Sequence, residues 1–166
     1  MHIIKVIAVV AAALSLSACG SKFRTYNGPE VTRVYVDKSE RRMYLIHHDR
    51  VLKQYPIQLG FAPAGHKQFE GDGRTPEGHY LIDKRNPNSK FHLSVGISYP
   101  NENDIARALA MGRDPGGDIF IHGGPQRGSS ANAKSDWTWG CIAVSDREME
   151  HIYAMVRDNT PIYIAP

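Results

Sequence analysis

The stretch TRVYVDKSERRMYLIHHDRVLKQYPIQL, residues 32–59, carries the pattern that decides the fold. Apolar and polar residues alternate there in three short runs, at 32–36, 43–47 and 51–59, with polar residues between the runs. Such alternation is typical of strands with one buried face, and short polar separators are typical of hairpin turns. The pattern therefore predicts that the domain begins with an antiparallel meander.

The rest of the chain predicts more strands than helices. Ser145-Asp146-Arg147-Glu148 has the form of a capping box and precedes apolar residues at helical spacing, so we expect a helix from 145 to about 158. A second helix, capped by Asn103-Asp104, is expected to run to about Met111. A loop is expected at 61–74, and further strands are expected at 78–83, 91–98, 118–122 and 162–164. The expected fold class is a single mainly-β domain with a few helices, spanning 31–166.

The N-terminal residues differ in composition from the rest. Residues 1–18 combine a positively charged start with an apolar stretch too short to cross a bilayer, which is typical of a secretion signal. The run Leu16-Ser17-Ala18-Cys19 resembles a bacterial lipobox. That resemblance implies cleavage before Cys19, a lipid on Cys19, and a lipidated tether over 19–30. The alternative is an ordinary signal peptide in which Cys19 has no special role.

These features predict an exported protein that is anchored in the periplasm by its lipid. Gly20 follows the cysteine where retention at the inner membrane commonly requires Asp, so the outer membrane is favoured. The net charge is +3, from 20 basic and 17 acidic side chains. No dense stripe of Lys and Arg is present, so the sequence does not predict a nucleic-acid partner.

The chain contains two cysteines, Cys19 and Cys141. If Cys19 carries lipid, Cys141 has no disulfide partner within the chain, and a lone thiol is unusual in an oxidising compartment. Such a cysteine is a candidate nucleophile when a suitable histidine lies elsewhere in the sequence. The alternative is a buried, unreactive cysteine.

His122 is the histidine best placed to activate this thiol. It ends a predicted strand, where a sheet could aim its ring, and Gly123 and Gly124 follow it. An imidazole can remove the thiol proton and so create the reactive thiolate. Gly140, immediately before Cys141, permits a tight turn that could direct backbone N–H groups at a developing oxyanion. A metal site built on this histidine and cysteine is disfavoured, because zinc needs three or four ligands, usually at short spacings.

The run of His122, fifteen intervening residues and then Thr138-Trp139-Gly140-Cys141 resembles the signature of the YkuD-type L,D-transpeptidases. Thr75-Pro76-Glu77-Gly78 resembles that family's Thr-Pro-x-Gly segment. Ser98-Tyr99-Pro100-Asn101 resembles a third segment of the same family. The resemblance covers roughly 31–165 and is strongest to the YafK/ErfK-like lipoproteins. It implies the family's catalytic-domain fold, a β-sandwich or barrel.

The resemblance also implies a mechanism. Cys141 would attack the L-centre carbonyl of the third residue, often diaminopimelate, of a peptidoglycan stem tetrapeptide, and His122 would take and return the proton. Backbone N–H groups around Trp139, Gly140 and Cys141 would hold the oxyanion, and the carbonyl of Gly123 would orient His122. An amine or water would then take the acyl group. The mechanism implies no metal and no organic cofactor.

Two positions depart from the family pattern. Trp139 stands where members usually have His, and Ala143 stands where they usually have Arg or Asn. Transfer, hydrolysis as an L,D-carboxypeptidase, and cleavage of a lipoprotein–peptidoglycan link therefore all remain open. A lipoprotein that binds peptidoglycan without catalysis is a further alternative.

Three more side chains are candidates for substrate binding. Trp137, like Trp139, could stack on a sugar or stem peptide or could pack within a lid. Arg127 could meet a substrate carboxylate or could be solvated. The Thr138 hydroxyl could contact substrate or hydrogen-bond within the catalytic turn.

Overall fold

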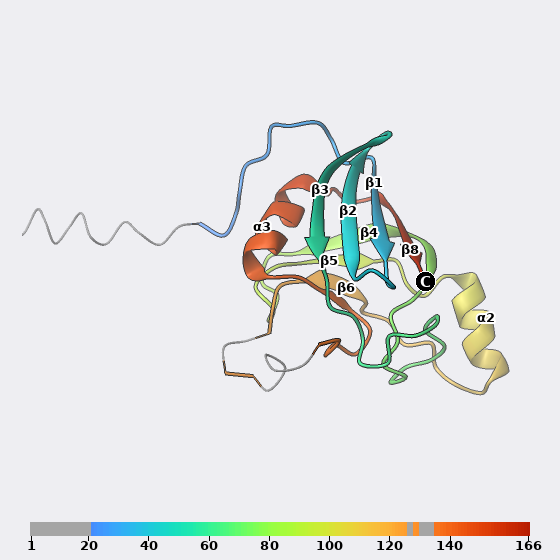
Figure 1. The fold of residues 1–166 in the computed structure, drawn as a ribbon. Coiled ribbons are helices and arrows are strands. Elements are labelled where there is room, and N and C mark those ends of the chain that lie inside the picture. The colour runs from blue at the N-terminus through green and yellow to red at the C-terminus, as the bar shows by residue number, and fades with distance from the viewer. Residues whose placement is uncertain (1–20, 126–127, 130–134) are drawn as a thin grey trace, which may run out of the picture.

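The computed structural model describes residues 21–125, 128–129 and 135–166. Within these residues the chain forms one eight-stranded sheet, in the order β3-β2-β1-β8-β4-β5-β6-β7, and two helices (Figure 1). The expectation of a mainly-β domain with a few helices is confirmed. The strands are β1 Arg33–Asp37, β2 Arg42–His47, β3 Arg50–Pro56, β4 Gly78–Asn86, β5 Ser94–Ile97, β6 Phe120–His122, β7 Ile142–Ala143 and β8 Pro161–Ala165.

The predicted meander is confirmed as β1, β2 and β3, which pair antiparallel. The third strand ends at Pro56 rather than at residue 59, since proline has no N–H to donate to a ladder. The chain then leaves the meander and reaches the far end of the sheet, where Gln58 bridges Ala143 and Gly60 bridges Thr138. This departure brings the first half of the chain to the end of the sheet that carries Cys141.

The C-terminal strand β8 lies in the middle of the sheet. It pairs parallel with β1 on one side and antiparallel with β4 on the other. β4 continues beyond β8 to pair with β5, with a shift of register between Ile82 and Arg85. The sheet curls at this point, so that the meander faces the layer of β5 and β6 in Figure 1.

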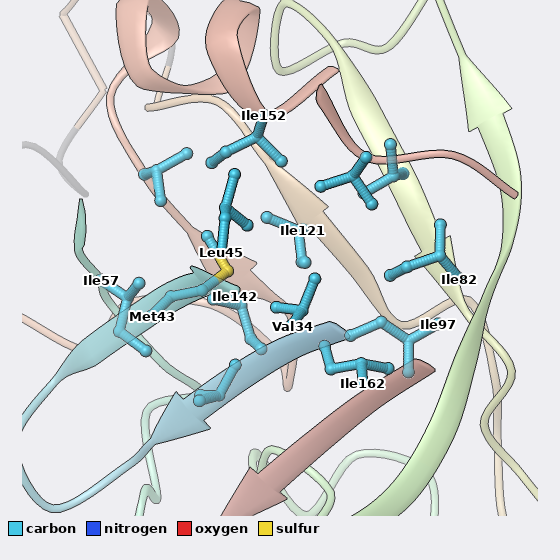
Figure 2. Packing of buried hydrophobic residues seen from close by; sticks show 14 of the residues in the cluster. Val34, Met43, Leu45, Ile57, Ile82, Ile97, Ile121, Ile142, Ile152 and Ile162 are labelled. Atoms are coloured by element: carbon cyan, nitrogen blue, oxygen red, sulfur yellow. The ribbon is translucent and has the colours of Figure 1, made fainter. Parts of the chain in front are cut away.

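The hydrophobic core fills the space between the two halves of the curled sheet. Figure 2 shows side chains from the meander, from β4 and β5, and from β6 and β7 converging on one another. The members labelled there are all essentially inaccessible to solvent: Val34, Met43, Leu45, Ile57, Ile82, Ile97, Ile121, Ile142, Ile152 and Ile162. Burial of such aliphatic side chains contributes about 1.5–3 kcal/mol each, so this core fixes the strands that carry the site.

The helix α3, Asp146–Met155, covers one side of this core and contacts β5 and β6. Its predicted capping box is confirmed, because the Ser145 side chain accepts from the backbone N–H of Glu148 and the Glu148 side chain returns a bond to Ser145. Met149, Ile152 and Met155 form its buried face.

The helix α2, Glu102–Ala110, begins two residues earlier than the sequence suggested. Its N-cap is Asn101, whose side chain accepts from the N–H groups of Asn103 and Asp104, and Asp104 returns the bond to Asn101. Neither described helix is long and apolar enough to cross a membrane.

Residues 21–30 form no helix or strand but lie against the domain. Lys22 Nζ donates to the carbonyls of Pro87 and His92, and Arg24 forms a 2.6 Å ion pair with Glu150 of α3. These residues are the described part of the predicted tether. The predicted signal over 1–18 and the lipidation residue Cys19 lie outside the described residues.

Candidate active site

The parallel pairing of β6 with β7 brings Cys141 close to His122 across nineteen positions of sequence. Ile121 is opposite Ile142 and His122 is opposite Ala143, so Cys141 lies beside Phe120. Alternate side chains of a strand point to opposite faces. Because Ile121 and Ile142 point into the core, His122 and Cys141 share the other face, offset by two residues, or about 7 Å along the strand.

Cys141 is a free cysteine in a partly buried position. The N–H of Phe120 donates to its Sγ at 3.4 Å, and Sγ lies 3.6 Å from the carbonyl oxygen of Asp118. Burial raises the pKa of the Cys141 thiol, and the Phe120 N–H and the positive charge of Lys67 only partly offset that effect. The resting group is therefore a thiol, and its attack on a substrate requires a base.

His122 has the properties of such a base. Its Nδ1 lies 2.7 Å from the carbonyl oxygen of Gly123. A carbonyl only accepts, so Nδ1 carries the proton and Nε2 keeps a lone pair that can accept one. Burial lowers the pKa of His122, and the bond to Gly123 opposes this only in part. The imidazole is therefore neutral near pH 7.

Two aromatic rings hold the imidazole in place. Phe91 stacks on it with ring centroids 4.5 Å apart, and Trp137 contacts it edge-on at 5.6 Å. Trp137 also packs against Phe91 at 5.6 Å. Of the two predicted stacking residues, Trp137 thus packs inside the site, whereas Trp139 is 71% exposed.

The turn at 137–141 is held by the buried side chain of Thr138. Its hydroxyl donates to the carbonyl of Cys141 at 2.7 Å and accepts from the N–H of Gly140 at 3.2 Å. The hydroxyl therefore hydrogen-bonds within the turn, and the side chain is only 2% exposed. The Gly140 N–H would have to leave this hydroxyl before it could bind an oxyanion.

Gly140 has a φ of +128°, in the region that favours glycine. A Cβ placed there would lie 2.7 Å from the carbonyl oxygen of Arg74. The turn is further anchored to the segment after β3, because Thr138 N–H donates to the Leu59 carbonyl and Phe61 N–H donates to the Thr138 carbonyl. Two segments distant in sequence thus set the position of Cys141.

A cavity of about 310 Å³ adjoins Cys141. Trp139 lies at its edge, in T-shaped contact with Phe61 at 5.0 Å. The described residue His122 does not line this cavity. A second cavity of about 440 Å³ lies beside Trp137 and Ala143. The residues lining the first cavity are Lys67, Glu70, Gly71, Gly116, Gly117, Asp118, Ile119, Trp139 and Cys141.

Lys67 and Asp72 form an ion pair of 2.9 Å beside this cavity, with side chains 3% and 5% exposed. Burial acts to raise the pKa of Asp72, but the N–H groups of Gln68 and Arg74, together with Lys67, hold it below its ordinary value. The sequence predicts a loop at 61–74 but no role for these two residues. The only sequence signal for such a role is that two opposite charges, Lys67 and Asp72, lie just before the Thr-Pro-Glu-Gly segment.

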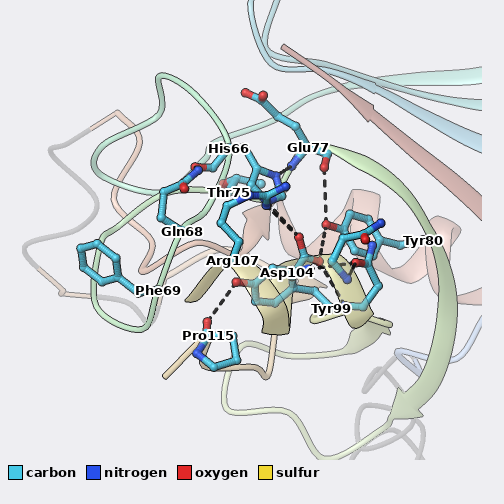
Figure 3. A network of polar contacts seen from close by, with 12 residues as sticks. His66, Gln68, Phe69, Thr75, Glu77, Tyr80, Tyr99, Asp104, Arg107 and Pro115 are labelled. Atoms are coloured by element: carbon cyan, nitrogen blue, oxygen red, sulfur yellow. Dashed lines mark hydrogen bonds and ion pairs between the residues drawn. The ribbon is translucent and has the colours of Figure 1, made fainter. Parts of the chain in front are cut away.

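A polar network fixes the same loop to α2 (Figure 3). His66 Nδ1 accepts the N–H of Glu77, so its Nε2 carries the proton that it donates to Asp104 at 2.9 Å. Asp104 also accepts from the hydroxyl of Tyr80 at 2.9 Å. The network holds His66, the residue next to Lys67, although His66 itself does not line the cavity beside Cys141.

The structure thus brings Gly123, Trp137, Thr138, Trp139 and Gly140 around the two candidate catalytic side chains. Their assigned roles stay predictions, because contacts show position and not chemistry. Arg127, predicted to bind a substrate carboxylate, lies outside the described residues, as does Cys19. Among the residues that the structure describes, no group of three His, Cys, Asp or Glu side chains is arranged to hold a metal ion.

The position of Cys141 directly before β7 and of His122 at the end of the neighbouring parallel strand β6 fits a domain that pairs a thiol nucleophile with an imidazole base. The chain belongs to the YkuD family, the L,D-transpeptidase catalytic domain, whose family model matches residues 31–164. The family resemblance inferred from the sequence, and the fold it implied, are therefore confirmed.

Relatives and solved structures agree with this membership. The chain is 26% identical over 109 residues to the Escherichia coli protein named "Putative L,D-transpeptidase YafK", covering 64% of this chain and 38% of that protein. It is similar to the helical cell shape determining protein Pgp2 of Campylobacter jejuni, with a TM-score of 0.63 and 27% identity over 91% of this chain and 53% of the other.

A more distant structure shows the same fold. An L,D-transpeptidase from Mycobacterium smegmatis matches with a TM-score of 0.55 and 15% identity over 82% of this chain and 59% of the other. The chain therefore spans little more than a third of the curated relative and about half of these solved chains.

Proposed function

We propose that this protein modifies peptidoglycan as a cysteine L,D-transpeptidase, forming an acyl-enzyme thioester from stem tetrapeptides. The observation that carries the proposal is the pairing of β6 with β7, which puts Cys141 and a neutral His122 on one face. A thiol that needs a base and an imidazole that is free to act as one together form a nucleophilic pair.

The reaction begins when the thiol proton of Cys141 passes to Nε2 of His122. The sulfur then attacks the L-centre carbonyl of the third stem residue, and the carbonyl oxygen becomes an oxyanion held by backbone N–H groups of the 139–141 turn. When this intermediate collapses, the bond to D-alanine breaks and His122 protonates the departing amine. The thioester on Cys141 remains.

The second half of the reaction releases the acyl group. An acceptor amine attacks the thioester, His122 takes its proton, and the sulfur leaves as the thiol, which gives a crosslink. If water attacks instead, the product is a shortened stem peptide. The carbonyl of Gly123 keeps the imidazole oriented through both steps, since it holds the proton on Nδ1.

Hydrolysis is the second candidate, and a specific observation favours it. Trp139 and Ala143 replace polar residues that the family usually has beside the cysteine, and Ala143 is buried. Fewer polar contacts are then left to hold an acceptor peptide. Under this alternative the protein would be an L,D-carboxypeptidase or would cleave a peptidoglycan-linked lipoprotein from the wall. A role in cell shape would accord with the similarity to Pgp2.

Incubation of the purified domain with muropeptides, followed by mass analysis, tests the proposal. A new crosslink indicates transfer, loss of D-alanine indicates carboxypeptidase action, and a released lipoprotein fragment indicates cleavage of an anchor. Cys141→Ser and His122→Ala should each abolish the product while remaining folded. Turnover by a folded Cys141→Ser variant would contradict the mechanism, and a wild type that only binds peptidoglycan would support a non-catalytic lipoprotein.

The location of the protein is proposed on sequence grounds. We infer export, cleavage after residue 18 and lipidation of Cys19, which would place the domain in the periplasm on an outer-membrane anchor. Metabolic labelling with a fatty acid tests this inference. Wild type should be labelled and Cys19→Ala should not, whereas Cys141→Ala, a matched cysteine control, should be labelled normally.

A further inference from the structure

Lys67 is a buried cation in the wall of the cavity beside Cys141. Its Nζ donates to Asp72 at 2.9 Å and to the carbonyl of Phe69 at 3.2 Å. An ammonium has three N–H donors. Of the described contacts, these two use two donors, so one remains for a group that enters the cavity.

The other charges that line the cavity are anionic. Glu70 lies on the exposed rim, and Asp118 is exposed and pairs with Lys84 at 3.2 Å. Water screens such rim charges strongly, whereas it screens the buried ammonium of Lys67 far less. Lys67 lines the cavity whereas its partner Asp72 does not, so the cavity presents the positive end of this ion pair and a negative rim. These two ends complement the carboxylate and the ammonium of an α-amino-acid group.

The cavity also has open space for such a group. Gly71 and Gly117 line it, and a Cβ added at either would meet no atom closer than 4.0 Å. The stability of the fold does not account for a buried ion pair here, because well-packed apolar residues of similar volume usually stabilise a protein at least as well.

Building on the proposed function, we propose that Lys67 binds a carboxylate of the stem peptide in this cavity and thereby selects the donor substrate. A donor peptide with diaminopimelate as its third residue carries two candidate carboxylates. One is on the distal amino-acid end of the diaminopimelate, and the other is the terminal carboxylate of the departing D-alanine. The leaving amine must meet His122, which does not line this cavity. The distal carboxylate of the third residue is therefore the expected partner of Lys67, with its neighbouring ammonium near Glu70.

Three synthetic tetrapeptides test the proposal on the intact domain. One carries both carboxylates, one has the distal carboxylate converted to a carboxamide, and one has the terminal carboxylate converted to a carboxamide. A hydrogen bond to a charged partner is worth about tenfold or more in kcat/KM. We expect wild type to lose about that factor with the distal amide and to lose much less with the terminal amide.

Variants then assign the effect to Lys67. Lys67→Met should turn over the acid and the distal amide at similar rates, and Lys67→Arg should restore most of the preference. Lys53→Met removes an exposed lysine of β3 that does not line the cavity, and as a matched control it should keep the wild-type preference. If Lys67→Met fails to fold because it leaves the buried Asp72 without its partner, the double variant Lys67→Met/Asp72→Asn removes both charges and should likewise turn over the acid and the distal amide at similar rates.

The outcomes separate this proposal from the one on which it rests. Equal turnover of all three peptides by wild type, with Cys141→Ser inactive, would overturn the role of Lys67 and leave the proposed function intact. If wild type loses turnover only with the terminal amide, the assignment to the distal carboxylate is overturned and Lys67 binds the leaving residue instead. Absence of any thioester with every peptide would overturn both proposals.

Discussion

At Cys141 and His122 burial acts on both titratable groups in the direction that removes charge. It raises the pKa of the thiol and lowers the pKa of the imidazole. The pair therefore rests as thiol and neutral imidazole, and under the proposed mechanism the proton moves between them only during attack on a substrate. An exposed thiolate would oxidise readily in an oxidising compartment, whereas a protonated thiol does so more slowly.

The pH dependence of Cys141 alkylation follows from these shifts. As pH falls, His122 stays neutral to below the 6.5 of a free imidazole, so wild-type iodoacetamide reactivity should persist below that pH before declining. In His122→Ala, reactivity at pH 7 should drop about 100-fold and should rise with pH through a midpoint above the 9.0 of a free thiol. An unchanged rate in His122→Ala would contradict the base role.

Gly140 is a backbone position at which substitution should be costly. Gly140→Ala should cost about 2 kcal/mol or more of unfolding free energy, because an alanine is strained at φ +128° and its Cβ would approach Arg74 at 2.7 Å. Urea unfolding measures this loss. Gly124→Ala is the matched control, since its Cβ would find no atom closer than 3.7 Å, and it should change stability little. Equal effects of the two substitutions would show that the turn tolerates a side chain.

At the scale of elements, local patterns predicted well and boundaries less well. The meander and the capping box of α3 are local, because alternation and a Ser-x-x-Glu spacing report on neighbouring residues alone. The cap of α2 was misplaced by two residues, since Asn101 and Asn103 are both plausible caps and only the reciprocal bond with Asp104 distinguishes them. The strand β3 ended early at Pro56 for a reason visible in the sequence.

The capping box of α3 makes a testable contribution to stability. Ser145→Ala should lower the unfolding free energy by about 1 kcal/mol, because the N–H of Glu148 loses its acceptor. Ser145→Thr retains a capping hydroxyl and should lose little. Thermal or urea unfolding compares the two variants, and an unaffected Ser145→Ala would mean that the helix end is satisfied in another way.

At the scale of the whole molecule, the sequence could not supply the long-range pairings. Motif resemblance indicated that His122 and Cys141 meet, but the parallel alignments of β1 with β8 and of β6 with β7 depend on the complete core. The cavity with Lys67 was missed for the same reason, since its walls come from three separate loops. Spacing along a chain gives no measure of which loops share a surface.

The central position of β8 predicts that the C-terminal residues are essential to folding. A chain that stops after Thr160 leaves β1 and β4 without the strand between them and removes the buried Ile162 and Ile164 from the core. We expect it to show no cooperative thermal transition and poor dispersion in proton NMR spectra. Removal of residues 1–29, whose described part from 21 onward supplies no strand, should preserve the transition. A folded C-terminal truncation would contradict the role assigned to β8.

The parallel contact between β6 and β7 has a consequence during biogenesis. Bringing Phe120 beside Cys141 requires closing a loop of about twenty residues, and the conformational entropy of that closure is recovered only once the core assembles. An unfolded polypeptide therefore carries an ordinary sulfhydryl without an assisting imidazole. The rate at which His122-dependent labelling of that sulfhydryl appears would therefore report when the native state forms.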